Sequence, residues 1–330
     1  MPTERPAIAR LALSAVATVG LAIASVVWSE SWFWARWRPE DSALGLLETL
    51  LVYALAVQVV RFVASRWRVA ASESGAWQRV LLAGALYGWL VEGIVVTTVI
   101  DDLPLTLSYT GLAWHALFTV LLGWWWMPRQ LDRPLARSIV PLMAVGVGVG
   151  AWASFWRFEE GAQTPVLDYA LFVTASTVAY GVGLAIWWRF RSSAEPGLRG
   201  SVIAIAALAL LAVLHGIDNP LTLIGVALVG LALLALIHTT PRVQTAPATE
   251  VPLLATAGPA PYRSLWRLVL IPVVATAIFA LFAASPDPIP SGWLFYLVTV
   301  PAGAALFALA WWWARRSARR RQSAATWANH

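Results

Sequence analysis

The chain has 330 residues, of which 59% are hydrophobic and only 12% are charged, and its formal net charge is +6. Because about a quarter of the residues in a soluble globular protein are charged, this composition excludes an ordinary soluble domain and indicates a chain embedded in lipid. The sequence has neither cysteine nor lysine, which excludes disulfides, thiolate metal sites, cysteine nucleophiles and Schiff-base chemistry on lysine.

Ten apolar segments are candidates for crossing a bilayer, which takes about 20 consecutive apolar residues in an α-helix. In chain order, the predicted spans are 9–29, 43–63, 80–100, 109–127, 138–156, 166–188, 200–217, 220–238, 266–284 and 292–313. The sequence therefore predicts an all-α, polytopic bundle of about ten transmembrane helices, with the lipid bilayer as its main partner.

The arginines test this number of spans and orient the chain. With ten spans, 20 of the 23 arginines lie on one side, at the N-terminus, in the loops after the even-numbered spans, at the span ends that border these segments, and in the C-terminal tail. Only Arg36, Arg38 and Arg157 fall on the other side. The arginine-rich side of a membrane protein is normally cytoplasmic. Both termini are therefore predicted on the cytoplasmic side of a plasma or inner cell membrane.

One long segment interrupts the series of spans. Residues 239–264 are rich in proline, alanine and threonine, and this composition predicts a flexible cytoplasmic linker. It would divide an eight-helix core (1–238) from a two-helix hairpin (265–314). The arginine-rich tail (315–330) is expected to favour anionic lipid, and no nucleic acid partner is expected. No internal repeat is evident.

Few ionisable or strongly polar residues lie within the spans. Each ionised side chain there costs about 2.5–3.5 kcal/mol on insertion scales, so such residues often mark function. The candidates are Glu48 on the second span, Glu92 on the third, His115 on the fourth, and His215 with Asn219 at the outer end of the seventh. All of them lie in the outer third of the membrane, which predicts one shared polar site.

Small residues predict how two of these helices meet. Gly84, Gly88 and Glu92 are spaced by four and share one helix face, and Gly111 and His115 do the same on the next span. Small residues allow close approach of membrane helices. If the two faces meet, Glu92 and His115 come within reach of each other.

Two interpretations of these residues remain open. A carboxylate and an imidazole can activate water, and a second imidazole with an amide can stabilise an oxyanion, which suits amide hydrolysis without a covalent nucleophile. The same Glu and His residues could instead hold a zinc ion, although no HExxH motif is present; no other cofactor is predicted. Alternatively, the pair is only an interhelical hydrogen bond, and His215 and Asn219 only end a helix.

The segments LLAGALYGWLVEGIVV and GLAWHALFTVLLGWWWM resemble the paired motifs of the PrsW-type membrane proteases, and HGIDN is similar to the His-x-x-x-Asn ending of the related CAAX-protease superfamily. Where those families open with adjacent glutamates, the second span here has a single one, Glu48. The resemblance implies a glutamate-dependent hydrolase that cleaves a membrane-tethered peptide near the outer surface. Glu92 would be the base, His115 its partner, His215 and Asn219 the oxyanion donors, and Glu48 a second acid.

Two other classes of function compete with the hydrolase. A transporter could use Glu92 and His115 to relay protons or to bind a cation, and polar groups continuing to the cytoplasmic side would favour it. A non-catalytic membrane scaffold would instead use the linker and the arginine-rich tail for its interactions.

Overall fold

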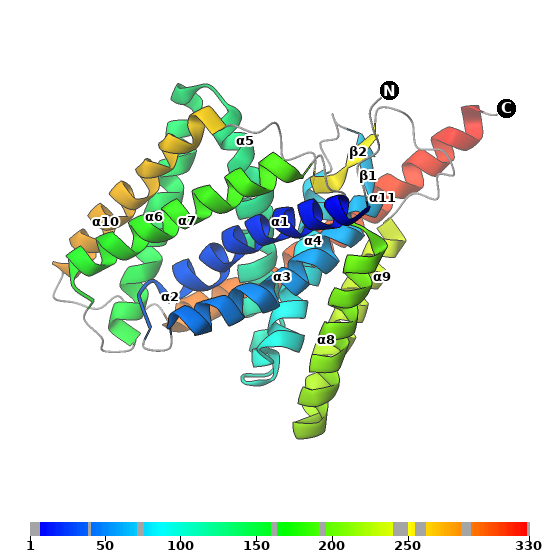
Figure 1. Cartoon of the computed structure of the whole chain (residues 1–330), viewed down its shortest axis with the longest axis horizontal. Coiled ribbons are helices and arrows are strands. Elements are labelled where there is room, and N and C mark those ends of the chain that lie inside the picture. The colour runs from blue at the N-terminus through cyan, green and yellow to red at the C-terminus, as the bar shows by residue number, and fades with distance from the viewer. Residues whose placement is uncertain are drawn as a thin grey trace. The chain divides into compact units, whose positions relative to one another are not determined.

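A computed structural model describes residues 7–38, 41–70, 76–159, 164–191, 196–239, 250–254, 262–284 and 292–328 (Figure 1). In this part of the chain, nine helices are long and apolar enough to cross a membrane. They run over Ile8–Trp34, Ala43–Arg66, Leu105–Asp132, Leu135–Phe155, Val166–Phe190, Leu198–Asp218, Pro220–Thr239, Tyr262–Ala283 and Tyr296–Arg320. The protein is therefore an all-α, polytopic membrane protein, as its composition predicts.

The remaining predicted span, 80–100, is also helical but differs from the other nine. It consists of α4 (Ala76–Leu90) and a π-helical segment, η2 (Val91–Val95). The end of α4 that begins at Ala76 carries a buried glutamine and a buried arginine, and η2 carries Glu92, so this segment is less apolar than its neighbours. Nearly all of its residues are buried within the protein.

The chain divides into two units. Unit 1 comprises residues 1–54, 126–194 and 257–297, and unit 2 comprises residues 55–125, 195–256 and 298–330. Most of the predicted linker, at 240–249 and 255–261, lies outside the described residues. The predicted division into core, linker, hairpin and tail stays a prediction.

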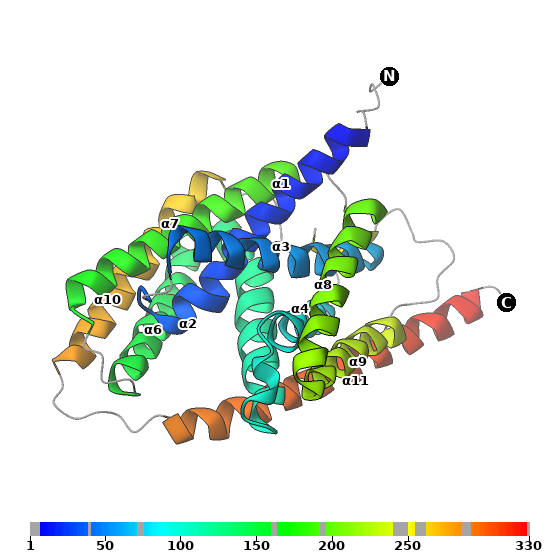
Figure 2. The ribbon, with the colours of Figure 1, turned by 60° about the horizontal axis from the view of Figure 1, so that its bottom comes forward.

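Unit 1 is built mainly on the packing of four long helices. Its elements are α1 (Ala7–Val26), η1 (Val27–Ser31), α2 (Trp32–Trp34), the first half of α3 (Ala43–Arg66), α5 (Met127–Asp132), α6 (Leu135–Glu159), α7 (Val166–Phe190), η8 (Tyr262–Val269) and α10 (Leu270–Ala283). Helix α1 packs along α7, and α10 packs against both α6 and α7. Figures 1 and 2 both show the blue α1 beside the green α7.

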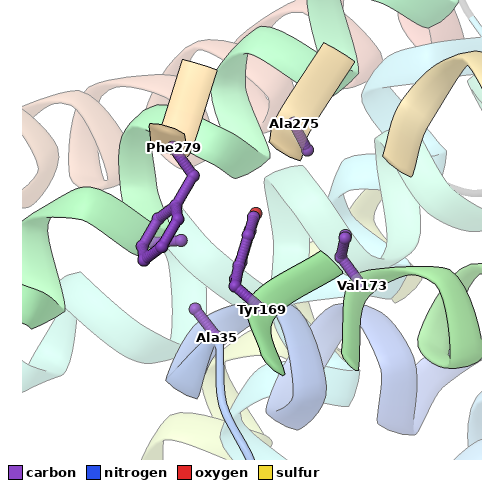
Figure 3. Close-up of a cluster of buried hydrophobic side chains, with 6 residues drawn as sticks. Ala35, Tyr169, Val173, Ala275 and Phe279 are labelled. Atoms are coloured by element: carbon purple, nitrogen blue, oxygen red, sulfur yellow. The ribbon is translucent and has the colours of Figure 1, made fainter. Parts of the chain in front are cut away.

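A buried apolar cluster joins these helices in unit 1 (Figure 3). The rings of Tyr169 on α7 and Phe279 on α10 stack with their centroids 4.1 Å apart. Ala35, Val173 and Ala275 close around them. The small side chains beside the two stacked rings allow the backbones to approach closely, which is how membrane helices gain packing energy without a hydrophobic driving force.

Unit 2 holds most of the candidate site. Its elements are α4, η2, η3 (Thr98–Ile100), η4 (Leu105–Leu107), η5 (Tyr109–Trp126), α8 (Leu198–Asp218), η6 (Pro220–Thr222), α9 (Leu223–Thr239) and most of α11 (Gly292–Ala328). Two three-residue strands, β1 (Arg68–Ala70) and β2 (Glu250–Pro252), pair antiparallel with Val69 opposite Val251. Helix α9 packs against α4 and η2, and α8 also contacts η2.

Candidate functional site

Glycine residues bring α4 and η5 into backbone contact. A Cβ atom on Gly84 would lie 2.7 Å from the Cα atom of Ala116, and one on Gly88 would lie 2.1 Å from the carbonyl oxygen of Gly111. No larger residue fits at either glycine without a shift of backbone. The small-residue faces predicted from the sequence therefore do meet, and they set the distance between the two helices.

Glu92 and His115 both lie on π-helical segments. Glu92 is in η2, which continues α4 and is closed by a hydrogen bond of 2.9 Å from the Val96 N–H to the Val91 carbonyl. His115 is in η5, which is π-helical over its whole length. Segments of π-helix are rare and are frequent at functional sites. A π turn changes the direction in which side chains leave the helix, so it determines the direction in which Glu92 and His115 point.

The two side chains form a buried pair. The Nε2 atom of His115 lies 2.5 Å from the Oε1 atom of Glu92, and only 6% of Glu92 and 2% of His115 are exposed. The hydroxyl of Thr98 donates a hydrogen bond to the other carboxylate oxygen of Glu92. The predicted contact between Glu92 and His115 is confirmed, whereas their catalytic role stays a prediction.

A strained residue positions the threonine of this site. Thr97, directly before Thr98, has φ 60° and ψ 12°, in the left-handed region. That region is unfavourable for a β-branched side chain and needs a compensating interaction. The hydrogen bond from Thr98 to Glu92 is such an interaction, so the carboxylate and the turn stabilise each other.

Aromatic and hydroxyl groups surround the imidazole. The ring of Tyr87 meets the His115 ring edge-on at a centroid distance of 5.7 Å, and Trp124 packs against Tyr87 at 5.1 Å. Thr119, one helical turn after His115 on η5, is completely buried. Tyr87 therefore packs against the imidazole, and Trp124 packs behind Tyr87.

His215 approaches the same segment by a different contact. Its Nδ1–H donates to the backbone carbonyl of Ile94, two residues beyond Glu92, at a distance of 3.0 Å. The close contact of Gly93 with Gly225, whose added Cβ atom would lie 2.1 Å from the Gly93 carbonyl oxygen, holds α9 against η2 as well. The ring of His215 is half-buried.

The remaining two candidates have exposed side chains. The side chain of Asn219 is exposed, and its Oδ1 accepts a hydrogen bond of 3.0 Å from the Leu221 N–H at the start of η6. Glu48 lies on the part of α3 that belongs to unit 1, and its side chain is exposed. Unit 2 therefore assembles Glu92, His115 and the backbone near His215.

An apolar groove of about 690 Å³ lies elsewhere in unit 2. It runs between α8, α9, α4 and residues 59–63 of α3, and its lining includes Leu90, Ile94 and Val213. Neither Glu92 nor His115 lines it. Leu90 and Ile94 share one face of their segment, so Glu92 between them points to the other side, toward η5.

The side chains at the buried pair are poorly suited to binding a zinc ion. Among the residues that the structure describes, no group of three or more His, Cys, Asp or Glu side chains could hold a metal ion. Catalytic zinc sites use three protein ligands, and this site has one carboxylate and one imidazole.

Sequence reasoning missed Thr97, Thr98 and Tyr87. Thr98 follows Glu92 by six residues. In a regular α-helix, side chains that contact each other are three or four residues apart, so this spacing does not predict a contact. Only the π segment and the left-handed turn after it bring Thr98 back to the carboxylate. The sequence carries no local signal for either feature.

Comparison of the chain with known protein families, with curated proteins and with solved structures finds no match.

Proposed function

We propose that this membrane protein is a glutamate-dependent hydrolase that cleaves a membrane-tethered peptide near the extracytoplasmic side. The observation that carries the proposal is the buried contact of Glu92 with His115 on two π-helical segments. An ionisable pair inside a membrane protein is costly, and it is retained mainly where a proton or a charge must be handled.

The chemistry follows from the two groups. A water molecule lies between the pair and the carbonyl group of an amide. Glu92 takes a proton from this water as the water oxygen attacks the carbonyl carbon, and His115 stabilises the change in charge on Glu92. The proton then passes to the leaving amine as the carbon–nitrogen bond breaks. The hydrogen bond from Thr98 fixes the carboxylate during both steps.

The oxyanion of the tetrahedral intermediate needs donors, and His215 and Asn219 are the candidates. With Nδ1–H bound to Ile94, the Nε2 atom of a neutral His215 is an acceptor, so its protonated form would be the donor. The Oδ1 atom of Asn219 is engaged by Leu221, which leaves its NH₂ group for a ligand. No step is assigned to Glu48.

The test compares membranes of cells that produce either the wild-type chain or Glu92→Gln. Mass spectrometry of peptide ends in membrane-anchored proteins should find ends that need the wild-type chain. General base catalysis contributes about 10²- to 10⁴-fold, so Glu92→Gln should slow their appearance by that factor. Asp168→Asn, at an exposed carboxylate in unit 1, is the matched control and should behave as wild type. Unchanged processing by Glu92→Gln would refute the assignment.

A second function, proton-coupled transport, is favoured by buried polar groups that continue along the same helices. Thr119 is completely buried one turn from His115, and Gln78 and Arg79 are buried at the predicted cytoplasmic end of α4. Proteoliposomes with a pH-sensitive dye inside would show proton flux for the wild-type chain and none for Glu92→Gln if this function holds. Flux in that assay without any new peptide ends would put transport ahead of hydrolysis.

A further inference from the structure

A second glutamate stands in the same local setting as Glu92. Glu30 lies on η1 (Val27–Ser31), a five-residue π-helical segment that continues α1 directly. Glu92 lies on η2 (Val91–Val95), a five-residue π-helical segment that continues α4 directly. Each segment is closed by one N–H bond back to its first residue. Two unrelated helices rarely end in the same uncommon turn.

Each glutamate is followed at the same distance by a left-handed residue. Ala35 has φ 57° and Thr97 has φ 60°, and each comes five residues after its glutamate. These are the two non-glycine residues with positive φ in the described parts of the chain. Because L-residues seldom adopt this conformation, the coincidence points to one shared backbone path.

In each case, the carboxylate is bound by a side chain on the next long helix of the chain, and the separation in sequence is the same. The Tyr53 hydroxyl on α3 donates to Oε1 of Glu30, and Nε2 of His115 on η5 contacts Oε1 of Glu92. The separation is 23 residues in both pairs. The second oxygen also has a donor in each case, the Trp34 indole N–H at 3.2 Å for Glu30 and the Thr98 hydroxyl for Glu92.

The correspondence extends to the sequence at one constant offset. Three residues of unit 2 each follow a residue of unit 1 by 62 positions, and the pairs are Glu30 and Glu92, Ala35 and Thr97, Tyr53 and His115. The two residues after each partner are identical, because Tyr53-Ala-Leu matches His115-Ala-Leu. Hydropathy does not reveal this repeat, since every span in the chain is apolar.

The first helix of each pair is also held in the same way. In unit 1, α1 packs on α7 where Gly20 meets Gly183, with an added Cβ atom on Gly183 only 2.6 Å from the Gly20 carbonyl oxygen. In unit 2, α4 and η2 pack on α9, where Gly93 meets Gly225. Both α7 and α9 are the second helices of later helix pairs in the chain.

We propose that the helix pairs α1–α3 and α4–η5 are two copies of one ancestral unit, and that Glu30 with Tyr53 is a second carboxylate site equivalent to Glu92 with His115. The two sites differ in chemistry. The Tyr53 hydroxyl and the Trp34 indole N–H donate hydrogen bonds to Glu30, and the Nη1 atom of Arg38 lies 3.8 Å from its carboxylate. An imidazole ring can either donate or accept a hydrogen bond through its nitrogens, so the partner of Glu92 differs in chemistry from the partners of Glu30.

Reciprocal substitutions test the equivalence without relying on any catalytic activity. Tyr53→His places an imidazole beside Glu30, and His115→Tyr places a phenol beside Glu92. Tyr53→Leu and His115→Leu remove the polar group from each site. Thermal unfolding of the full chain in detergent, followed by tryptophan fluorescence, should give both swapped variants a Tm near wild type. Both leucine variants should unfold several degrees lower. Swapped variants that lose as much as the leucine variants would overturn the proposal.

A double-mutant cycle gives a second measurement, which tolerates weak folding of the leucine variants. Glu30→Gln and Tyr53→Phe, which remove the charge and the hydroxyl, should be non-additive in Tm, as direct partners are. Glu48→Gln with Tyr53→Phe is the matched control on the same helix and should be additive, because Glu48 is exposed. Additive behaviour of the Glu30 pair would show that it is no site. Neither measurement depends on peptide processing, so the proposed function can fail independently.

Discussion

Gly88 gives the sharpest test of the α4–η5 interface. In Gly88→Ala, the new Cβ atom would lie 2.1 Å from the Gly111 carbonyl oxygen and 2.9 Å from its Cα atom. An ordinary contact starts at 3.4 Å, so the helices must separate by more than 1 Å, and both atoms belong to backbone that cannot rotate away. Such overpacking costs about 3 kcal/mol at the upper end of its usual range. Alanine regains about 0.5–1 kcal/mol of helix propensity.

The expected net effect is a loss of about 2 kcal/mol in the free energy of unfolding. Chemical denaturation in mixed micelles, followed by tryptophan fluorescence, measures it. Glu92 lies one turn beyond Gly88, so the same separation should move it from His115 and reduce peptide processing. Gly230→Ala on α9 is the control, because nothing lies within 4 Å of its new Cβ atom, and it should gain about 0.5–1 kcal/mol. Equal stability of the two variants would refute the close contact of α4 with η5.

Three further predictions concern single sites. Glu92→Leu or His115→Leu alone should lower the free energy of unfolding by about 3–5 kcal/mol, because each leaves a buried polar partner uncompensated. The double variant should recover most of this loss in the same denaturation assay, and additive losses would contradict a direct interaction between the two side chains. Thr97→Gly should stabilise the protein by about 0.5–1 kcal/mol, because glycine relieves a left-handed strain of about 1–2 kcal/mol but has more conformational entropy in the unfolded state. Val96→Gly is the control and should destabilise the protein, because Val96 has a φ of −99°. A change of stability in the same direction for both variants would argue against the left-handed turn at Thr97. Asn219→Ala should cost about 0.5–2 kcal/mol by removing the cap on the Leu221 N–H, while Asn219→Asp should keep most of the stability; a neutral alanine variant would show that the cap contributes nothing.

The buried pair shows how far sequence reasoning reaches into the site. The spacing of Gly88 and Glu92 by four placed the carboxylate on a packed face, and the same spacing of Gly111 and His115 did so for the imidazole. Those two facts predicted the contact on the condition that the two faces meet, because four residues make about one helical turn. They did not predict Thr98, since its position depends on a π turn that breaks the helical period.

Depth alone was a weaker guide than facing. His215 and Asn219 were predicted at the same depth as the pair, yet His215 binds a backbone carbonyl and Asn219 caps its own turn. Glu48 shares that level by sequence but lies in unit 1 with its side chain exposed. A shared depth constrains one coordinate of a side chain, whereas a contact requires all three.

By itself, the sequence determined that the chain crosses a membrane many times as α-helices, and it predicted which side each loop occupies. Both follow from local physics, because lipid demands apolar runs whose backbone hydrogen bonds close within one segment, and arginine resists transfer across the bilayer. Only the tertiary structure decided where the π turns fall, that α9 packs against η2, and that Tyr53 binds Glu30. These features depend on contacts between residues far apart in the chain, such as Gly93 with Gly225, and no local pattern encodes them.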